Sequence, residues 1–201
     1  MKRGSFMTEE QQNSNDISES ENGGKIRYLI IAALVIALDQ GSKYWAAVRL
    51  HGRNDEEINV ITGFLKLSYT ENAGIAFGML AGVNVGWLLV AVSIVAVAIV
   101  AFYMMRTPAR HKLLLWSLAL VAGGIAGNMI DRIRMGRVID FILAYLNVNG
   151  RTYEWPVFNV ADTAITIGAA LLAIELFIAP QSEKAKDEDV AVIEAPTETN
   201  E

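Results

Sequence analysis

Four long apolar stretches, separated by polar segments, dominate the hydrophobic pattern of the chain. They cover roughly residues 28–48, 83–105, 113–130 and 157–179. A helix that spans a bilayer needs about 20 mainly apolar residues, and each stretch is close to that length. Because backbone polar groups in lipid must find their partners within the segment, we predict four transmembrane helices. The first stretch follows a polar N-terminal segment and contains charged residues, so we interpret it as a retained span and not as a cleaved signal peptide.

Weaker signals lie in the connections that we place outside the membrane. Residues 64–69, Phe-Leu-Lys-Leu-Ser-Tyr, alternate in the period of a β-strand, which predicts a small sheet on the membrane surface. Tyr145, Tyr153 and Trp155 in the last connection are typical of an aromatic belt at a membrane interface.

The distribution of charge divides the chain into two acidic end segments and an apolar central region. Hydrophobic residues make up 53% of the chain and charged residues only 19%, yet the net charge is -5. The acidity comes from residues 1–24 and 181–201, because residues 25–180 hold 13 basic and 10 acidic side chains. Both end segments are poor in large apolar residues, so we predict two disordered acidic tails around a four-helix membrane domain over residues 25–180.

The distribution of basic residues predicts the orientation in the membrane. Arg106, Arg110 and Lys112 lie in the short second connection, and Lys25 and Arg27 flank the first span. By the positive-inside rule, these groups and both termini lie in the cytoplasm. The last connection then places several arginines outside, where a functional site would give them a role.

Several kinds of chemistry are excluded or disfavoured by residue content. The chain has no cysteine, which excludes disulfides, thiol catalysis and thiolate-bound metals. Its two histidines, His51 and His111, both lie in loop-like sequence, which argues against a histidine metal site or a serine–histidine pair. We therefore expect no metal and no other cofactor, and no dense basic stripe suggests a nucleic-acid partner.

Ionisable and amide side chains inside the spans are the candidate functional residues, because burying them in a bilayer is costly. Asp39 and Lys43 lie four residues apart on one helix face, either as a structural ion pair or as the lining of a polar site. Asn128, Asp131 and Arg132 share a face at the end of the third span. The last two could be charges at the membrane interface, whereas Asn128 needs a partner inside the span.

Two aspartates on the same membrane face are the candidate catalytic pair. Asp140 lies in the apolar run Val-Ile-Asp-Phe, and Asp162 is predicted about one and a half turns into the fourth helix. The third helix ends on the side where the fourth begins, so a loop can bring the two carboxyls together. Carboxyls that share a partly buried site split their pKa values, so one can act as base and the other as acid. The alternative is that each pairs with an arginine of the same connection.

The first outer connection contains a second candidate for binding. The segment 71–78, Glu-Asn-Ala-Gly-Ile-Ala-Phe-Gly, combines an amide with small residues that permit close backbone approach. It is either an ordinary turn or a surface for an extended peptide.

Five sequence blocks in order resemble the lipoprotein signal peptidases (signal peptidase II), over about residues 25–180. The blocks are Asp39-Gln40-Gly41-Ser42-Lys43, Asn72-Ala73-Gly74-Ile75-Ala76-Phe77, Gly127-Asn128-Met129-Ile130-Asp131-Arg132, Val138-Ile139-Asp140-Phe141 and Phe158-Asn159-Val160-Ala161-Asp162. The resemblance implies an all-α integral membrane fold, with four transmembrane helices and a small β-cradle in the first outer loop. It implies an aspartic endopeptidase of the bacterial inner membrane that cuts proproteins just before a diacylglyceryl-modified cysteine, and that binds cyclic peptide antibiotics of the globomycin type.

The resemblance also implies roles for individual residues. Asp140 and Asp162 would be catalytic. The substrate would contact Asn72, Asn128, Arg132 and Asn159. The supporting residues would be Asp39, Lys43, Gly74 and Asp131. The acidic tails lie outside the family pattern.

Two other functions are open on the residues alone. A small transport or channel protein would use its intramembrane charges as an ion path, but the second span has no charge and most of the others cluster toward one face. A purely structural membrane subunit would use the acids only for pairing.

Overall fold

A computed structural model describes residues 9–51, 57–74 and 85–194, with side chains described over 24–51, 57–74 and 86–177. Its helices are α1 (Glu9–Leu50), α2 (Val85–Arg106), α3 (Lys112–Met135) and α4 (Val160–Glu194). Within them, four segments of the described chain are long and apolar enough to cross a membrane: Gly24–Leu50, Gly86–Arg106, Lys112–Met135 and Val160–Phe177. The four predicted spans are thus confirmed, with ends that differ by a few residues.

Helix α3 is the centre of the bundle and packs against each of the other three helices. Glycines allow the close approach. A Cβ atom added to Gly123 would lie 2.8 Å from the carbonyl oxygen of Ala32 in α1, and one added to Gly124 would lie 2.5 Å from that of Ala161 in α4. Small residues at such contacts let helices pack tightly in lipid, where no hydrophobic effect drives them together.

The sheet has four antiparallel strands in the order β1-β2-β3-β4, namely Ile58–Ile61, Leu65–Asn72, Val138–Val148 and Arg151–Glu154. The strand predicted at residues 64–69 is confirmed as part of β2. The sheet also takes two strands from the connection between α3 and α4, which the sequence pattern did not predict. Its β2–β3 register pairs Thr70 with Asp140 and Asn72 with Val138. This pairing places Asp140 in a strand that is buried at its beginning, and it brings Asn72 within reach of that strand.

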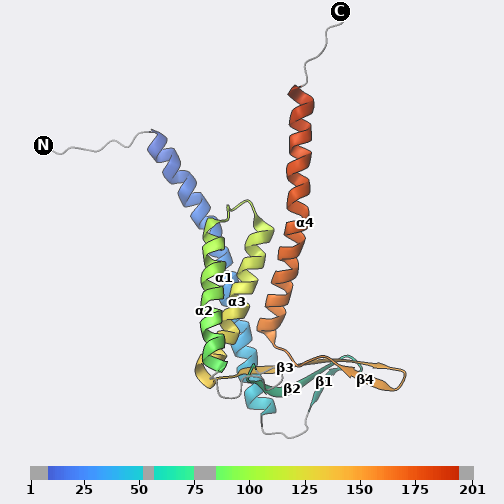
Figure 1. The fold of residues 1–201 in the computed structure, drawn as a ribbon. Helices are drawn as coiled ribbons and strands as arrows, with labels where there is room; N and C mark the ends of the chain where they lie inside the picture. Colours follow the sequence, from blue (N-terminus) through green and yellow to red (C-terminus); the bar gives the residue numbers. More distant parts are fainter. Residues whose placement is uncertain (1–8, 52–56, 75–84, 195–201) are drawn as a thin grey trace, which may run out of the picture.

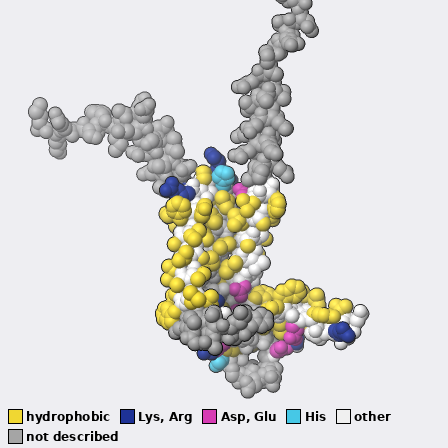
Figure 2. Space-filling view, viewed as in Figure 1, with side chains coloured by type: hydrophobic (Ala, Val, Ile, Leu, Met, Phe, Trp, Pro, Cys, Tyr) yellow, Lys and Arg dark blue, Asp and Glu magenta, His cyan; other side chains and the backbone are white. Residues whose placement is uncertain are grey.

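The helices and the sheet meet at one end of the molecule. In Figure 1 the sheet projects sideways from that end, while the start of α1, the α2–α3 connection and the end of α4 lie at the other. Hydrophobic side chains cover the visible face of the bundle between a group of basic side chains and the sheet (Figure 2). This surface is what a lipid-facing bundle requires.

One expectation, the aromatic belt, differs from the structure. Tyr153 and Trp155 are exposed as an interfacial belt requires, but Tyr145 is buried, and its hydroxyl oxygen accepts a hydrogen bond from the N–H of Gly63 at 2.8 Å. Helices α1 and α4 continue past their apolar spans into much of the segments for which composition predicts disorder. The division of the chain into two tails and a core remains a prediction.

Candidate active site

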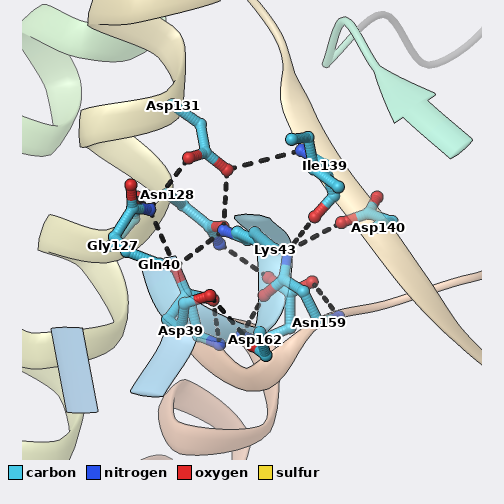
Figure 3. Close-up of polar contacts among 12 residues, drawn as sticks. Asp39, Gln40, Lys43, Gly127, Asn128, Asp131, Ile139, Asp140, Asn159 and Asp162 are labelled. Carbon is cyan, nitrogen blue, oxygen red and sulfur yellow. Dashed lines mark hydrogen bonds and ion pairs between the residues drawn. The ribbon is translucent and has the colours of Figure 1, made fainter. Parts of the chain in front are cut away.

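The polar residues singled out in the sequence converge where α1, α3, β3 and α4 meet (Figure 3). The hydrogen-bonded group contains Asp39, Gln40, Lys43, Asn72, Asn128, Asp131, Asp140, Asn159 and Asp162. Residues far apart in the chain therefore form one continuous network at the end of the bundle that carries the sheet.

Lys43 is the hub of the buried half of this network. Its Nζ atom lies 2.8 Å from Asp39 Oδ2, 2.8 Å from Asp131 Oδ2 and 2.9 Å from Asn128 Oδ1. An ammonium group has three N–H donors, so all three are used. The predicted Asp39–Lys43 pair is confirmed, and Asp131 joins it. Asp131 is 1% exposed, so it is not a charge at the membrane interface.

The two carboxylates that share Lys43 also hold neighbouring elements in place. Asp39 Oδ1 accepts a hydrogen bond from the backbone N–H of Ala161 at 2.9 Å, which ties α1 to the first turn of α4. Asp131 Oδ2 accepts one from the N–H of Ile139 at 3.4 Å, at the start of β3. Gln40 donates to Asp131 Oδ1 at 2.8 Å and to Asp39 Oδ2 at 3.2 Å. The sequence pattern predicts no separate role for Gln40, although an amide within an apolar span needs partners just as Asn128 does.

The charge of Lys43 fixes the direction of the Asn128 amide. Lys43 can only donate hydrogen bonds, so the oxygen of Asn128 must face it. The nitrogen of the same amide then faces Asp162 and donates to its Oδ1 at 2.7 Å. Asn159 Nδ2 also donates to Asn128 Oδ1, at 3.1 Å. The buried ion cluster therefore determines that Asn128 presents a donor to Asp162.

Asp162 lies in the first turn of α4, not one and a half turns into the helix as predicted, because α4 begins at Val160. Its backbone N–H donates to Asn159 Oδ1 at 2.9 Å, and the N–H of Asn159 donates to Asp162 Oδ2 at 3.3 Å. This reciprocal pair is a capping box, with Asn and Asp in place of the more usual residues. The Asn-x-x-Asp spacing before an apolar run was the sequence signal for it.

Asp140 projects from the buried start of β3 and is 2% exposed. Asn159 Nδ2 donates to its Oδ1 at 2.7 Å, and Asn72 Nδ2 donates to its Oδ2 at 3.0 Å. Burial raises the pKa of the Asp140 carboxyl, and the nearby charge of Asp162 raises it further. The two amide donors and Lys43 act in the opposite direction but do not cancel the effect. Asp140 thus holds its proton to a higher pH than an ordinary aspartate does.

Asn159 connects the two candidate catalytic residues. It donates to Asp140 through its side chain and forms the capping box with Asp162 through both side chain and backbone. Each of the four carboxyl oxygens of the two aspartates accepts one N–H. Within the described part of the chain neither aspartate forms an ion pair, and Arg137 pairs instead with Glu71 at 2.6 Å. The described residues therefore contradict the alternative in which each aspartate pairs with an arginine.

Arg132 and Gly74 lie at the border of the network. Arg132 is half-buried, and its Nη1 lies 3.5 Å from the carbonyl oxygen of Asn128. Its Nε atom is buried and has no hydrogen-bond partner among the described residues. Gly74 has a φ of 74°, and its N–H donates to Asn72 Oδ1 at 2.8 Å, which orients the Asn72 amide toward Asp140. The rest of the predicted binding segment, residues 75–78, lies outside the described residues.

Over the described ranges, no group of three or more His, Cys, Asp or Glu side chains is placed to hold a metal ion. The two carboxyls suit proton transfer, because one that holds its proton can act as an acid while the other, held by hydrogen-bond donors, acts as a base. Fold and site together define an integral membrane protein with two aspartates held by amide donors at one end of a four-helix bundle.

Comparison with known proteins agrees with this class. A family model described as "Signal peptidase (SPase) II" matches residues 31–178. The lipoprotein signal peptidase of Symbiobacterium thermophilum is 43% identical over 150 residues, which cover 75% of this chain and 93% of the relative. That of Syntrophus aciditrophicus is 41% identical over 163 residues, covering 80% and 97%.

The fold also matches solved structures. One, described as a bacterial membrane enzyme determined by the in meso method at 1.9 Å resolution, superposes with a TM-score of 0.66 at 30% identity, covering 75% of this chain and 92% of the other. The chain belongs to the signal peptidase II family, that is, the lipoprotein signal peptidases, and is an aspartic endopeptidase.

Proposed function

We propose that the chain removes signal peptides from diacylglyceryl-modified proproteins by cutting just before the lipid-bearing cysteine, with Asp140 and Asp162 as the catalytic pair. The observation that carries this proposal is the position of Asn159, which contacts both aspartates at the end of the bundle next to the sheet. Two carboxyls organised by one amide can divide the roles of acid and base. The substrate is then a membrane helix with a lipid at its C-terminal end.

In the proposed reaction, one aspartate accepts a proton from water, and the water attacks the carbonyl carbon of the scissile bond. The other aspartate donates its proton to the carbonyl oxygen, and a proton returned to the nitrogen lets the amine leave. The raised pKa of Asp140 favours a pair that carries one proton near neutral pH. The two groups titrate as a unit, so the proton belongs to the pair.

We assign the surrounding amides and the guanidinium to substrate binding. Near the membrane surface the substrate helix must unwind, because a helical carbonyl is not open to attack, and this frees backbone groups that need partners. Asn72, Asn128 and Asn159 already donate hydrogen bonds to the aspartates. The Nε–H group of Arg132 has no partner among the described residues, and we assign it to a substrate carbonyl. The ion cluster of Asp39, Lys43 and Asp131 supports Asn128 from behind, and Gly74 supports Asn72.

We place the active site near the outer face of the bacterial inner membrane, with both termini in the cytoplasm. Lys25, Arg27, Arg106 and Arg110 belong to the opposite end of the bundle from the sheet, which is the charge distribution of a cytoplasmic end. A cyclic peptide antibiotic of the globomycin type would inhibit the enzyme by occupying the space beside the two carboxyls.

The test is cleavage of a diacylglyceryl-modified proprotein by the purified wild type and by the Asp140→Asn and Asp162→Asn variants. Asparagine keeps the size of the side chain but cannot exchange the proton. We expect the wild type to cut and both variants to lose more than about a thousandfold in kcat, if each residue is required for proton transfer. Equal cleavage by all three proteins would refute the catalytic pair.

A further inference from the structure

A group of polar side chains lies on strands β2 and β3 beside Asn72, outside the hydrogen-bond network of the active site. Glu71 Oε2 lies 2.6 Å from Nη1 of Arg137, the residue just before β3. The other carboxylate oxygen of Glu71, Oε1, accepts a hydrogen bond from the hydroxyl of Tyr69 at 2.9 Å. Both oxygens of Glu71 are therefore held, one from its own strand and one from the segment that leads into β3.

Each member of this group is in the protonation state that its contacts require. The hydrogen bond from Arg137, and after it the one from Tyr69, holds the pKa of Glu71 below its usual value, so Glu71 is an anion at neutral pH. Burial and the hydrogen bond to Glu71 raise the pKa of Tyr69 to about 12, so its hydroxyl keeps its proton and donates. Arginine is always a cation. The group is thus an ion pair extended by a neutral donor.

Tyr69 connects this group to helix α1. The rings of Tyr69 and His51, the residue after α1, meet edge to face with 4.7 Å between their centroids. Tyr69 also packs against a buried cluster that joins the end of α1 to β3, namely Ala46, Leu50 and Phe141. Glu71 is therefore attached to the body of the protein at two points, through Tyr69 to α1 and through Arg137 to the start of β3.

The last part of β2 needs such an attachment, because the pairing between β2 and β3 is interrupted before it. The register changes between Leu67 and Thr70, where three steps along β2 correspond to two along β3. An extra residue of this kind is a β-bulge, which disrupts the ladder locally. Beyond it, β2 forms three more pairs, at Thr70, Glu71 and Asn72. A shift of one residue there would turn the side chain of Asn72 to the opposite face, away from Asp140.

We propose that Glu71 is a positioning residue of the active site. Held by Tyr69 and Arg137, it fixes the register of the strand end that carries Asn72. Side chains alternate along a strand, so Glu71 and Asn72 point to opposite faces of β2. Holding Glu71 on one face therefore holds, on the other face, the amide that donates to Asp140 Oδ2 at 3.0 Å. This assignment rests on the proposed function, because it concerns a donor to a proposed catalytic carboxyl.

The experiment measures cleavage of a diacylglyceryl-modified proprotein by Glu71→Gln across a range of pH. Glutamine keeps the size of the side chain but loses the charge that pairs with Arg137. We expect kcat to fall about fivefold with KM nearly unchanged, which is roughly 1 kcal/mol and the upper end for an exposed ion pair.

The pH profile separates positioning from a direct effect of the charge. A weaker contact between Asn72 and Asp140 should raise the pKa of Asp140, so the basic limb of the kcat–pH profile of Glu71→Gln should move to higher pH. Loss of the charge of Glu71 alone would move the limb to lower pH, because a nearby negative charge raises the pKa of a carboxyl. Movement to lower pH would overturn the positioning role.

Glu57→Gln is the matched control, because Glu57 forms an ion pair of the same length, 2.6 Å, with Lys66 of β2. It should leave kcat and the pH profile unchanged. The double variant Glu71→Gln/Asn72→Ala tests whether Glu71 acts through Asn72. In that case, adding Glu71→Gln to Asn72→Ala should change kcat less than twofold, because the two residues then share one effect.

Variants of the partner residue complete the test. Arg137→Met should repeat the effect of Glu71→Gln, and Arg137→Lys, which keeps the charge, should retain at least half of kcat. Losses that multiply in the double variant, or a rise in KM with unchanged kcat, would overturn the positioning role while the proposed function stands. Failure of the wild type to cut would refute the proposed function, and the positioning role with it.

Discussion

Removal of the buried lysine should destabilise the protein more than any single surface change. In Lys43→Met, Asp39 and Asp131 would lose their common cation, at 2.8 Å from each, and Asn128 would lose one of its two donors. Lys43 is 2% exposed and Asp39 is fully buried, so water cannot replace the ammonium. Breaking a buried ion pair from one side costs about 3–5 kcal/mol in free energy of unfolding.

The hydrogen bonds that remain set a limit on this cost. Gln40 still donates to both carboxylates, and the N–H of Ala161 still donates to Asp39. These contacts keep the two negative charges hydrogen-bonded but not neutralised. The double variant Lys43→Met/Asp131→Asn removes one of the two charges and should recover about half of the lost free energy.

The assay is unfolding of the purified protein in mixed micelles with increasing SDS, followed by tryptophan fluorescence, together with cleavage of the lipidated proprotein. Lys66→Met is the control, because Lys66 pairs with Glu57 at the surface of the sheet, where an exposed pair adds little. We expect no measurable change for the control. The reasoning is refuted if Lys43→Met is no less stable than Lys66→Met, or if the double variant is less stable than Lys43→Met alone.

Three further outcomes follow from the structure. Gly124→Ala should lower the free energy of unfolding by about 1–3 kcal/mol and reduce cleavage, because the new Cβ would lie 2.5 Å from the carbonyl oxygen of Ala161. Gly41→Ala, with no atom within 4 Å, should change neither in the same assays, and equal effects of the two would contradict the tight α3–α4 contact. Asn72→Ala removes a donor that favours ionised Asp140, so the pKa of Asp140 should rise and the basic limb of the kcat–pH profile should move to higher pH. An unmoved or lowered limb would argue against Asp140 as a member of the titrating pair. EDTA should leave cleavage unchanged, because the proposed chemistry uses only carboxyls and water, and loss of activity on chelation would count against it.

Local properties of the sequence were enough to predict the membrane spans and most of the polar residues that form the buried network. Each span is a continuous apolar run, and a helix is the way for such a run to satisfy its backbone in lipid. Asp39, Lys43 and Asn128 stood out for the same reason, since polar groups in these runs need partners. For Asp131 the sequence left open a charge at the membrane interface. The strand in the first outer connection was visible because alternation of side chains is also a local signal.

Only the tertiary structure decided how these parts meet. Strands β3 and β4 come from a segment without clear alternation, and pairing with β2 forms them. The ion pair between Asp131 and Lys43 depends on contacts between α1 and α3, because the two residues are 88 positions apart in the chain. The groove beside Asp162 depends on how residues 155–158 fold back against the first turns of α4.

The physical reason is the range of the interactions. Hydropathy, helical spacing and capping act over a few residues and can be read directly along the chain. Which donor faces which carboxyl depends on close packing at glycines such as Gly123 and Gly124, and on the fixed hydrogen-bonding character of a single buried ammonium. The sequence by itself therefore determined which groups are buried in the membrane, whereas the tertiary structure decided that Asn128 points its nitrogen at Asp162 and that Asn159 joins the two aspartates.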